Sequence, residues 1–538
     1  MDWSLSAVLD IVTETAPKRE MLVWKDVRRT FGEVDGRARG LASFLISQGL
    51  GLQRERDHLE RWECGQSPVA LILNNCPEYI ESMVGCYRAR AVPFNVNQQY
   101  TPSEIRSVLE MVGAEAVIYH RSLGQLVQEA MVPSIRLAVE VDDRAGGSGV
   151  AGSVAFEEAL THPGHELPTP SPDDLYLVCT GGTTGLPKAV LWRQADVYVS
   201  AMGGQDEITA EQIAKAASTG SGVWFAPSPL MHAAAQWTVF AGLLGGATVV
   251  LHDDRTRFDA GAIVKTVADE RVTLMAIVGD AYARPIVEFL EHNPFDLSSL
   301  RVIGTGGATT SDESKHALLN LLPQVVIRDG YGASETGGMA YGSSSNQVLS
   351  EGFSPAPGAV VISADKSRLL DPGEGEIGWT ARQGRVPLGY LGDRVKTEAT
   401  FPILDGVRMA VPGDRAKVES DGSIHMLGRD SLVINTGGEK VFVEEVEEVL
   451  RNHPDVDDAL VVGRPSDRFG QEVVAVVQLR PGSNLEPIGL REFVALSLAR
   501  FKAPRWVAYC ELVQRHASGK PDYQWAIRFA DAAVPAAQ

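Results

Sequence analysis

The chain has 538 residues, which exceeds the size at which one hydrophobic core usually stops growing, so we expect two or more domains. Apolar residues make up 44% and charged residues 22% of the sequence, as in ordinary soluble globular proteins. The formal net charge of −20, from 49 lysines and arginines against 69 aspartates and glutamates, argues against a nucleic-acid partner and against docking on anionic lipid.

The cysteines and the first residues predict a cytoplasmic location. The five cysteines are odd in number and form no Cys-x-x-Cys pair, which fits a reducing compartment and argues against structural zinc. Residues 1–20 contain charges and lack the apolar core of a signal peptide. The longest uncharged run, residues 233–251, contains Gln236 and a Gly245-Gly246 break, so we expect a core helix, a turn and a strand there rather than a transmembrane segment.

The N-terminal third predicts helices alternating with strands. Residues 3–15 form an apolar helical stripe, and Thr30 and Glu33 have capping-box spacing before a second helix that the glycines at 49 and 51 should end. We expect the charged segment 51–66 to be a solvated helical excursion. Further strands are predicted at 21–24, 69–73, 92–97, 116–119, 135–141, 248–251, 274–278 and 302–304, with a helix at 77–88. This alternation is typical of a layered α/β protein.

A glycine- and threonine-rich loop follows at residues 180–188, between the apolar flanks 175–179 and 189–192, which we expect to be strands. Such a loop can direct backbone N–H groups and hydroxyls toward one anion, because glycine tolerates the φ angles of a concave backbone. Since Pro187 precedes Lys188 and Ala189 follows it, the loop is not a Walker A motif. We predict a polyphosphate ligand, although the bare composition also fits a surface turn.

The full string Thr180-Gly181-Gly182-Thr183-Thr184-Gly185-Leu186-Pro187-Lys188 resembles the phosphate-binding signature of the adenylate-forming enzymes, which include acyl-CoA synthetases, luciferases and peptide-synthetase adenylation domains. The sequence departs from the family at Ala189, where glycine is usual. The resemblance implies that this loop binds ATP, with Thr184 and Lys188 taking part in catalysis. The implied nucleotide ligands in the loop are Thr180, Gly181, Gly182, Thr183, Thr184, Gly185 and Lys188.

Residues 329–338 resemble a second motif of this family. In isolation the string would favour a β-turn with an exposed glutamate. The resemblance implies that Tyr331 stacks on adenine, that Ser334 contacts phosphate and that Glu335 holds Mg²⁺. The other residues implied to line the nucleotide are Asp329, Gly330 and Gly332, together with Gly306, Gly307 and Ala308 of a segment that also lines the acyl pocket.

His232, at the end of Pro229-Leu230-Met231-His232, resembles the family's gate beside the substrate carboxylate. A lone histidine in an apolar run is more often a core residue. With Gly307 and Gly332, His232 is the implied contact to the acid. Amino-acid-activating relatives place an aspartate in this motif, and none occurs between residues 223 and 251, which argues against an amino-acid substrate.

The C-terminal motifs complete the resemblance. Asp414 and Arg429 match the family's two ribose contacts. Ser431 stands where a hinge Asp or Lys is usual, with Asp430 beside it, so the hinge residue stays open. Gly437, Gly438 and Lys440 match the segment of the family along which coenzyme A lies. Lys520 matches the position of the family's catalytic lysine. A lysine after Ser-Gly is by itself usually a solvated loop charge. We expect helices at 443–450 and 490–498 and strands at 459–462 and 473–479.

These motifs predict an adenylate-forming enzyme fold of the α/β class, with a large multi-sheet layered domain over residues 1–428 and a small mobile α+β domain over 429–538. The implied function is that of an ATP-dependent acyl-CoA ligase with Mg²⁺, ATP, coenzyme A and a small-molecule carboxylic acid as its ligands. The sequence leaves open whether the chain forms a homodimer, which pathway it serves, and whether segment 51–66 is an interface.

The predicted substrate is a lipophilic acid, either a long-chain fatty acid or a steroid side-chain acid. The strings at 192–194, 279–285, 435–440 and 519–523 resemble bacterial fatty-acyl and sterol-side-chain CoA ligases more closely than other branches. An aryl or medium-chain acid is the alternative. An acyl-AMP ligase or luciferase-like enzyme would share every motif, whereas a binding protein without catalysis is disfavoured because Lys188, Glu335, Asp414, Arg429 and Lys520 occur together.

Overall fold

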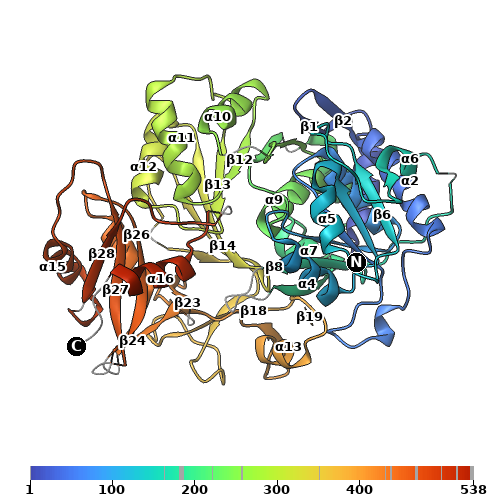
Figure 1. The fold of residues 1–538 in the computed structure, drawn as a ribbon. Coiled ribbons are helices and arrows are strands. Elements are labelled where there is room, and N and C mark those ends of the chain that lie inside the picture. The colour runs from blue at the N-terminus through green and yellow to red at the C-terminus, as the bar shows by residue number, and fades with distance from the viewer. Residues whose placement is uncertain are drawn as a thin grey trace.

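The computed structural model describes residues 2–162, 164–180, 187–220, 222–255, 258–350, 352–429, 432–436, 439–466, 470–498, 500–516 and 519–533. These residues form five sheets with helices packed on them, which confirms the predicted α/β class. In Figure 1 the N-terminal elements, in blue and cyan, and the C-terminal elements, in orange and red, lie on opposite sides of the molecule, with strands β14 and β18 between them.

The largest sheet has nine strands in the order β16-β15-β14-β13-β12-β10-β11-β1-β2. Its strands are β1 (Glu20–Trp24), β2 (Val27–Thr30), β10 (Val223–Ala226), β11 (Thr248–Leu251), β12 (Leu274–Ile277), β13 (Val302–Gly306), β14 (Val326–Ala333), β15 (Gly337–Ser344) and β16 (Ser354–Pro355). The neighbours from β14 through β1 are parallel, so the carboxyl ends of β12, β13 and β14 meet at one edge. Helices α10 (Ala260–Asp269), α11 (Asp280–His292) and α12 (Asp312–Leu321) share a core with these strands.

A second sheet is entirely parallel, in the order β4-β3-β5-β6-β7. Its strands are β3 (Pro68–Ile72), β4 (Val92–Asn95), β5 (Ala116–His120), β6 (Leu137–Val141) and β7 (Val154–Ala155). Every residue of β3 and β5 is buried, as the continuous apolar runs predict for a sheet covered on both faces. The helices of this half are α1 (Leu5–Thr15), α2 (Phe31–Ser47), α3 (Pro77–Arg88), α4 (Pro102–Val112), α5 (Gly124–Ala130) and α6 (Phe156–Leu160).

Two smaller sheets lie between the N-terminal and C-terminal elements. The first has the order β19-β9-β8 and consists of β8 (Leu175–Thr180), β9 (Lys188–Arg193) and β19 (Gly389–Tyr390). The second contains β17 (Ala359–Ile362), β18 (Gly378–Gln383), β20 (Ile403–Leu404), β21 (Val407–Ala410), β22 (Asp414–Val418) and β23 (Ile424–Arg429). The helices α7 (Gln194–Ala201), α8 (Ala210–Thr219), α9 (Ala233–Leu244) and α13 (Arg394–Thr400) complete this part.

The C-terminal residues form a sheet with its own two apolar clusters. Its strands are β24 (Ile434–Thr436), β25 (Glu439–Val441), β26 (Val456–Ser466), β27 (Gly470–Leu479) and β28 (Trp506–Cys510), and its helices are α14 (Val443–Arg451), α15 (Pro487–Ser497) and α16 (Tyr523–Ala533). The four elements predicted here from residue 443 onward are confirmed, with the strands longer than predicted. Figure 1 shows this group beside α11 and α12.

The structure confirms one of two local predictions and contradicts the other. Thr30 and Glu33 form the predicted capping box, and α2 ends before Gly49. The predicted helical excursion over 51–66 is wrong, because only Arg56–His58 form a single 3-10 turn, η1. The segment instead closes on itself through a β-bridge between Leu52 and Gln66, and Arg56 donates to the carbonyls of Glu60 and Glu63 inside the resulting loop.

The uncharged run at 233–251 folds as predicted. It forms helix α9, a glycine turn at Gly245 and Gly246, and strand β11 in the interior of the nine-stranded sheet. No helix among the residues described above is long and apolar enough to cross a membrane.

Candidate active site

The hairpin of β8 and β9 carries the predicted phosphate loop. Thr180 ends β8, Lys188 begins β9, and the two are Cα partners in the antiparallel ladder. Asn95 braces the base of the loop, because its side chain donates to the carbonyl of Cys179 (2.9 Å) and accepts from its N–H (3.0 Å). Burial raises the pKa of Cys179 well above its ordinary value, which favours the protonated thiol over the reactive thiolate. The loop residues Gly181, Gly182, Thr183, Thr184 and Gly185 lie outside the described residues.

Tyr390 connects the end of this hairpin to Glu335. Strand β19 pairs with β9, which places Tyr390 opposite Val190. The Tyr390 hydroxyl donates to Oε1 of Glu335 at 2.7 Å, and the Lys188 ammonium lies 5.0 Å from the centre of the Tyr390 ring. A carboxylate and an ammonium group therefore flank one tyrosine at the mouth of the loop, an arrangement suited to a metal-bound polyphosphate.

Sequence patterns did not single out Tyr390. The one signal that could have found it is its context, a tyrosine directly after glycine in a short β-prone string, which also describes Tyr331.

Glycines bring the ends of β13 and β14 close together. Gly306 and Gly330 are Cα partners on these parallel strands, and a Cβ on Gly306 would lie 2.8 Å from the carbonyl oxygen of Gly330. A Cβ on Gly332 would lie 2.2 Å from the carbonyl oxygen of Gly337, so β14 and β15 can approach only with glycine there. Gly307 follows with φ of +79°. The result is a backbone surface with few side chains, on which a flat ring can lie.

Residues 329–333 continue strand β14, and the turn expected for an isolated motif follows at residues 334–336, where Glu335 is half-buried rather than exposed. Tyr331 is part of this strand, and the carbonyl of Ser334, just beyond it, accepts a hydrogen bond from the Trp192 indole at 2.9 Å. Asp329 is 3.1 Å from the ammonium of Lys315 on α12. Burial raises the pKa of Asp329, and Lys315 opposes this effect. Asp329 therefore has a structural ion pair that the sequence did not reveal.

His232 and Lys520, far apart in the sequence, lie within electrostatic range of each other. His232 is the N-cap of α9, and among the described residues its buried Nε2 atom has no hydrogen-bond partner. Burial, and then the positive charge of Lys520, lower the pKa of His232 to about 4. The histidine is therefore neutral at pH 7, as expected for a group beside a cationic side chain. Gly519 packs against α11, where a Cβ would lie 3.1 Å from that of Ala281.

The two predicted ribose contacts also lie side by side. Asp414 on β22 and Arg429 on β23 are Cα partners, and Asp414 is buried. Lys440 lies on β25 opposite Asn435. The predicted contacts to coenzyme A at Gly437 and Gly438, and the hinge candidates Asp430 and Ser431, fall outside the described residues.

Within the described part of the chain, no three side chains of His, Cys, Asp or Glu gather as a metal-binding group. A Mg²⁺ ion in a nucleotide site needs no such group, because it is usually bound through one or two carboxylates, substrate phosphates and water. The carboxylate of Glu335 beside Lys188 and Tyr390 fits that requirement.

Comparison with known proteins gives matches over the whole chain. The family model of the AMP-binding enzyme matches residues 9–386, and that of the AMP-binding enzyme C-terminal domain matches residues 445–520. A medium-chain acyl-CoA ligase, Mig, of Mycobacterium avium is 42% identical over 97% of this chain and 98% of its own length. A 3-oxocholest-4-en-26-oate–CoA ligase of Rhodococcus rhodochrous is 35% identical over 98% and 96%.

Solved structures support the fold. The anthranilate CoA ligase AuaEII, in complex with anthranoyl-AMP, aligns with a TM-score of 0.82 and 21% identity over 99% of this chain and 98% of its own. A fatty acyl CoA synthetase of Mycobacterium tuberculosis aligns with a TM-score of 0.70 and 20% identity over 99% of both chains.

Proposed function

The chain belongs to the AMP-binding enzyme family and is an AMP-forming acyl-CoA synthetase, and from this premise we propose that it joins a lipophilic carboxylic acid to coenzyme A through an acyl-adenylate. The observation that carries the proposal is the packing of Gly519, next to Lys520, against Ala281 of α11, with the charge of Lys520 acting on His232, the residue implied to contact the acid. The products of the complete reaction are acyl-CoA, AMP and pyrophosphate.

In the first half-reaction the substrate carboxylate attacks the α-phosphorus of ATP and pyrophosphate leaves. The acid is already ionised at pH 7, so no general base is needed. The difficulty is the approach of an anion to a polyanion, which positive groups held in place by the protein relieve. We assign this role to Lys188, to the loop that contains Thr184, and to Lys520 at the oxygens where charge builds up. Glu335 would hold Mg²⁺, which when bound offsets phosphate charge.

The nucleotide would lie along the ends of β13 and β14. The glycine-lined surface at residues 306–307 and 330–332 supports a flat adenine ring, with Tyr331 stacking on it, Ala308 beside it and Ser334 near phosphate. Asp414 and Arg429 would bind the ribose, since the carboxylate can accept hydrogen bonds from both of its hydroxyls. Asp329 keeps its proposed place at the nucleotide, although its ion pair with Lys315 gives it a structural role as well.

In the second half-reaction the thiol of coenzyme A attacks the acyl carbon and AMP leaves. We propose that a small domain over residues 429–538 rotates against a large domain over 1–428 between the two steps. Gly437 and Gly438 would then let pantetheine approach the backbone closely, with Lys440 nearby. The separate apolar clusters of the C-terminal elements support such a division. We place both reactions in the cytoplasm, where ATP and coenzyme A are available, and the five free thiols are consistent with this.

The proposed acid is a long-chain fatty acid or a steroid side-chain acid. The Rhodococcus relative supports the steroid acid by its name. The higher identity of the Mycobacterium avium relative favours a second candidate, a medium-chain acid. The neutral His232 at the gate suits an acid with no amine near its carboxylate.

The test is a mass-spectrometric product assay with ATP, Mg²⁺ and a panel of medium-chain, long-chain, steroid and aryl acids, with and without coenzyme A. We expect acyl-CoA from a lipophilic acid and acyl-adenylate when coenzyme A is omitted. Acyl-adenylate that coenzyme A fails to consume would instead identify an acyl-AMP ligase. ATP binding without any product would contradict the assignment as an enzyme.

A further inference from the structure

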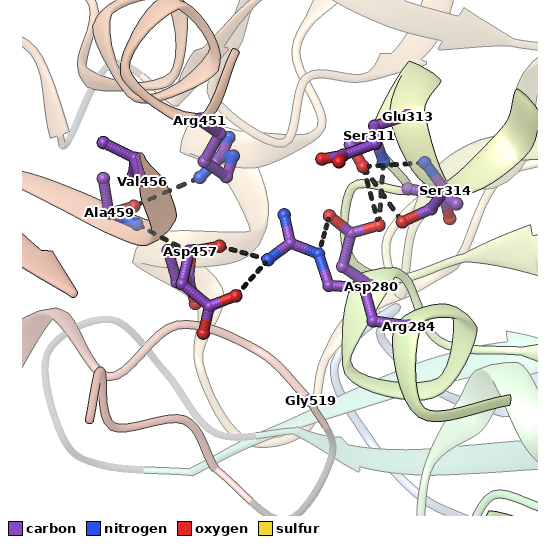
Figure 2. A network of polar contacts seen from close by, with 12 residues as sticks. Asp280, Arg284, Ser311, Glu313, Ser314, Arg451, Val456, Asp457, Ala459 and Gly519 are labelled. Carbon is purple, nitrogen blue, oxygen red and sulfur yellow. Dashed lines mark hydrogen bonds and ion pairs between the residues drawn. The ribbon is translucent and has the colours of Figure 1, made fainter. Parts of the chain in front are cut away.

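Arg284 joins helix α11 to the C-terminal strand β26. Its Nε lies 3.4 Å from Oδ2 of Asp280, one turn earlier on the same helix. Its Nη1 lies 3.3 Å from Oδ1 of Asp457 and also donates to the backbone carbonyl of Asp457. Figure 2 shows the guanidinium lying between the two aspartates, one from each part of the chain. The planar guanidinium of Arg284 therefore links helix α11 to strand β26 of the C-terminal part; we call this contact region the junction.

The large-domain end of this bridge is rigidly held. The Oδ1 atom of Asp280 accepts hydrogen bonds from the backbone N–H (2.9 Å) and the hydroxyl (3.2 Å) of Ser311, and Ser311 is the N-cap of α12. The Asp280 carboxylate is therefore oriented by the start of a neighbouring helix, and it orients Arg284 in turn. The side chains of Arg284 and Asp280 are 26% and 15% exposed. Such a partly buried pair is screened less by salt than a surface pair.

The other end of the bridge leads to Lys520. Asp458, the residue after Asp457, accepts from Nε and Nη2 of Arg515, both at 2.9 Å. Arg515 also donates through Nη1 to the carbonyl of Gly519 at 3.2 Å, and the N–H of His516 bonds the carbonyl of Lys520 at 2.9 Å. The turn that carries Lys520 is thus tied to the strand that Arg284 holds.

We propose that Arg284 is a positioning residue for the adenylation half-reaction: by binding Asp457 it docks the C-terminal part so that the Lys520 turn enters the site, and it must release Asp457 before the second half-reaction. This inference rests on the proposed function, in which Lys520 acts in the first half-reaction alone. It explains why the chain carries Asp280 and Arg284 in a string that the nucleotide contacts do not account for. Gly519 packs against Ala281 on α11, the helix that carries Arg284, so the docked arrangement holds the Lys520 turn against this helix, and the charge of Lys520 acts on His232.

A second ion pair crosses the same junction and provides a matched control. Arg480 on the loop after β27 contacts both carboxylate oxygens of Glu313 on α12, at 2.9 and 3.0 Å. The side chains of Arg480 and Glu313 are 41% and 56% exposed. Arg480 also donates through Nε to the carbonyl of Val456 at 3.2 Å, one residue before Asp457, so its removal tests whether any loss of contact to this strand slows adenylation or only the loss of Arg284. Exposed pairs of this kind stabilise weakly, so we expect little from its loss.

The experiment compares the half-reactions of the full-length wild type with those of Arg284→Ala, Arg284→Lys, Arg480→Ala and Lys520→Ala. Pyrophosphate release without coenzyme A measures adenylation, and acyl-CoA formation from a supplied acyl-adenylate measures the second step. For Arg284→Ala we expect a fall in the adenylation kcat of roughly 10- to 100-fold, because a small misplacement of a catalytic group costs that much. We expect KM for ATP within about twofold and a thioester rate at or above that of the wild type. Arg284→Lys should recover part of the loss, and Arg480→Ala should behave as wild type.

The other outcomes distinguish a failure of the inference about Arg284 from a failure of the proposed function. Equal loss in both half-reactions, or the same loss in Arg480→Ala, would make Arg284 a structural residue and overturn the inference. Full adenylation by Arg284→Ala, while Lys520→Ala is slow, would overturn the inference and leave the proposed function standing. A wild type that forms no acyl-adenylate from any lipophilic acid, or a Lys520→Ala variant with normal adenylation, would overturn the proposed function and the inference with it. Thermal unfolding of each variant separates misfolded protein from mispositioned protein.

Discussion

The proposed chemistry depends on a few charged side chains and on the neutral groups that hold them. Lys520 is the clearest case, because its position on the C-terminal part would allow it to act in one half-reaction and leave in the other. We predict that Lys520→Ala slows adenylation by about 10² to 10³, the usual cost of removing one donor at a developing charge. Thioester formation from a supplied acyl-adenylate should stay nearly intact. Rapid-quench measurement of both steps tests this, with Lys265→Ala on the exposed face of α10 as control. Equal losses would contradict the assignment.

The Tyr390 hydroxyl donates to Glu335, so the proposed Mg²⁺ site at this glutamate should respond to a change that leaves the carboxylate in place. We predict that Tyr390→Phe, which keeps the ring next to Lys188 and removes the donor to Glu335, raises the Mg²⁺ concentration for half-maximal adenylation by about tenfold, a typical effect of losing a residue that supports a metal ligand. Titration of activity with Mg²⁺ measures it. Tyr509→Phe, whose hydroxyl donates to the Leu485 carbonyl far from Glu335, is the control. An unchanged Mg²⁺ requirement would show that Tyr390 does not support the site.

The protonation of His232 should make the unfolding free energy of the protein depend on pH. Its pKa is lowered from 6.5 to about 4 in the folded chain, so between these values the unfolded chain binds more protons. The stability that the neutral histidine contributes is therefore present above pH 6.5 and is lost as the pH falls toward 4. We predict that, between pH 7 and pH 5, wild type loses about 2 kcal/mol more unfolding free energy than His232→Gln. Urea unfolding at both pH values tests this, and parallel losses would rule out the histidine as the cause.

At the scale of elements, the glycines of β13 and β14 determine how closely the strands at the proposed nucleotide site can pack. We predict that Gly332→Ala costs about 1 to 3 kcal/mol of stability, because its methyl group would meet the backbone oxygen of Gly337 and the strands must separate. Gly304→Ala on β13, whose nearest atom would be 3.9 Å away, is the matched control and should change stability little. Chemical denaturation distinguishes the two. Equal stability of both variants would mean that the β14–β15 contact is not tight.

The same elements show what a single sequence can predict. The β8–β9 hairpin, α3 and the buried strands were predictable, because apolar runs and glycine breaks act locally. The helical excursion at 51–66 was not predictable, since the segment is closed by the Leu52–Gln66 bridge and held by the ion pair of Glu55 with Arg90, both contacts between residues that are distant in sequence. Tyr390 was not predicted from the sequence for a related reason. Its role comes from strand β19 pairing with β9, a contact that no local pattern encodes.

At the scale of the whole molecule, the net charge of −20 opposes anionic substrates, while the proposed site contains Lys188 and Lys520. A field of this sign slows the approach of coenzyme A at low ionic strength, and salt screens it beyond about 10 Å at 0.1 M. We therefore predict that kcat/KM for coenzyme A rises about two- to threefold as salt increases from about 20 to 150 mM.

The matched control for this effect is pantetheine, the uncharged thiol fragment of coenzyme A, whose kcat/KM should stay constant over the same range because it carries no phosphate for the field to act on. Steady-state assays with a preformed acyl-adenylate isolate the thiol step from ATP binding. If kcat/KM for coenzyme A falls with salt while that for pantetheine does not, then the lysines near the site attract the phosphates from a distance and outweigh the net charge. The electrostatic steering of coenzyme A would then come from the charges near the site rather than from the net charge of the whole protein.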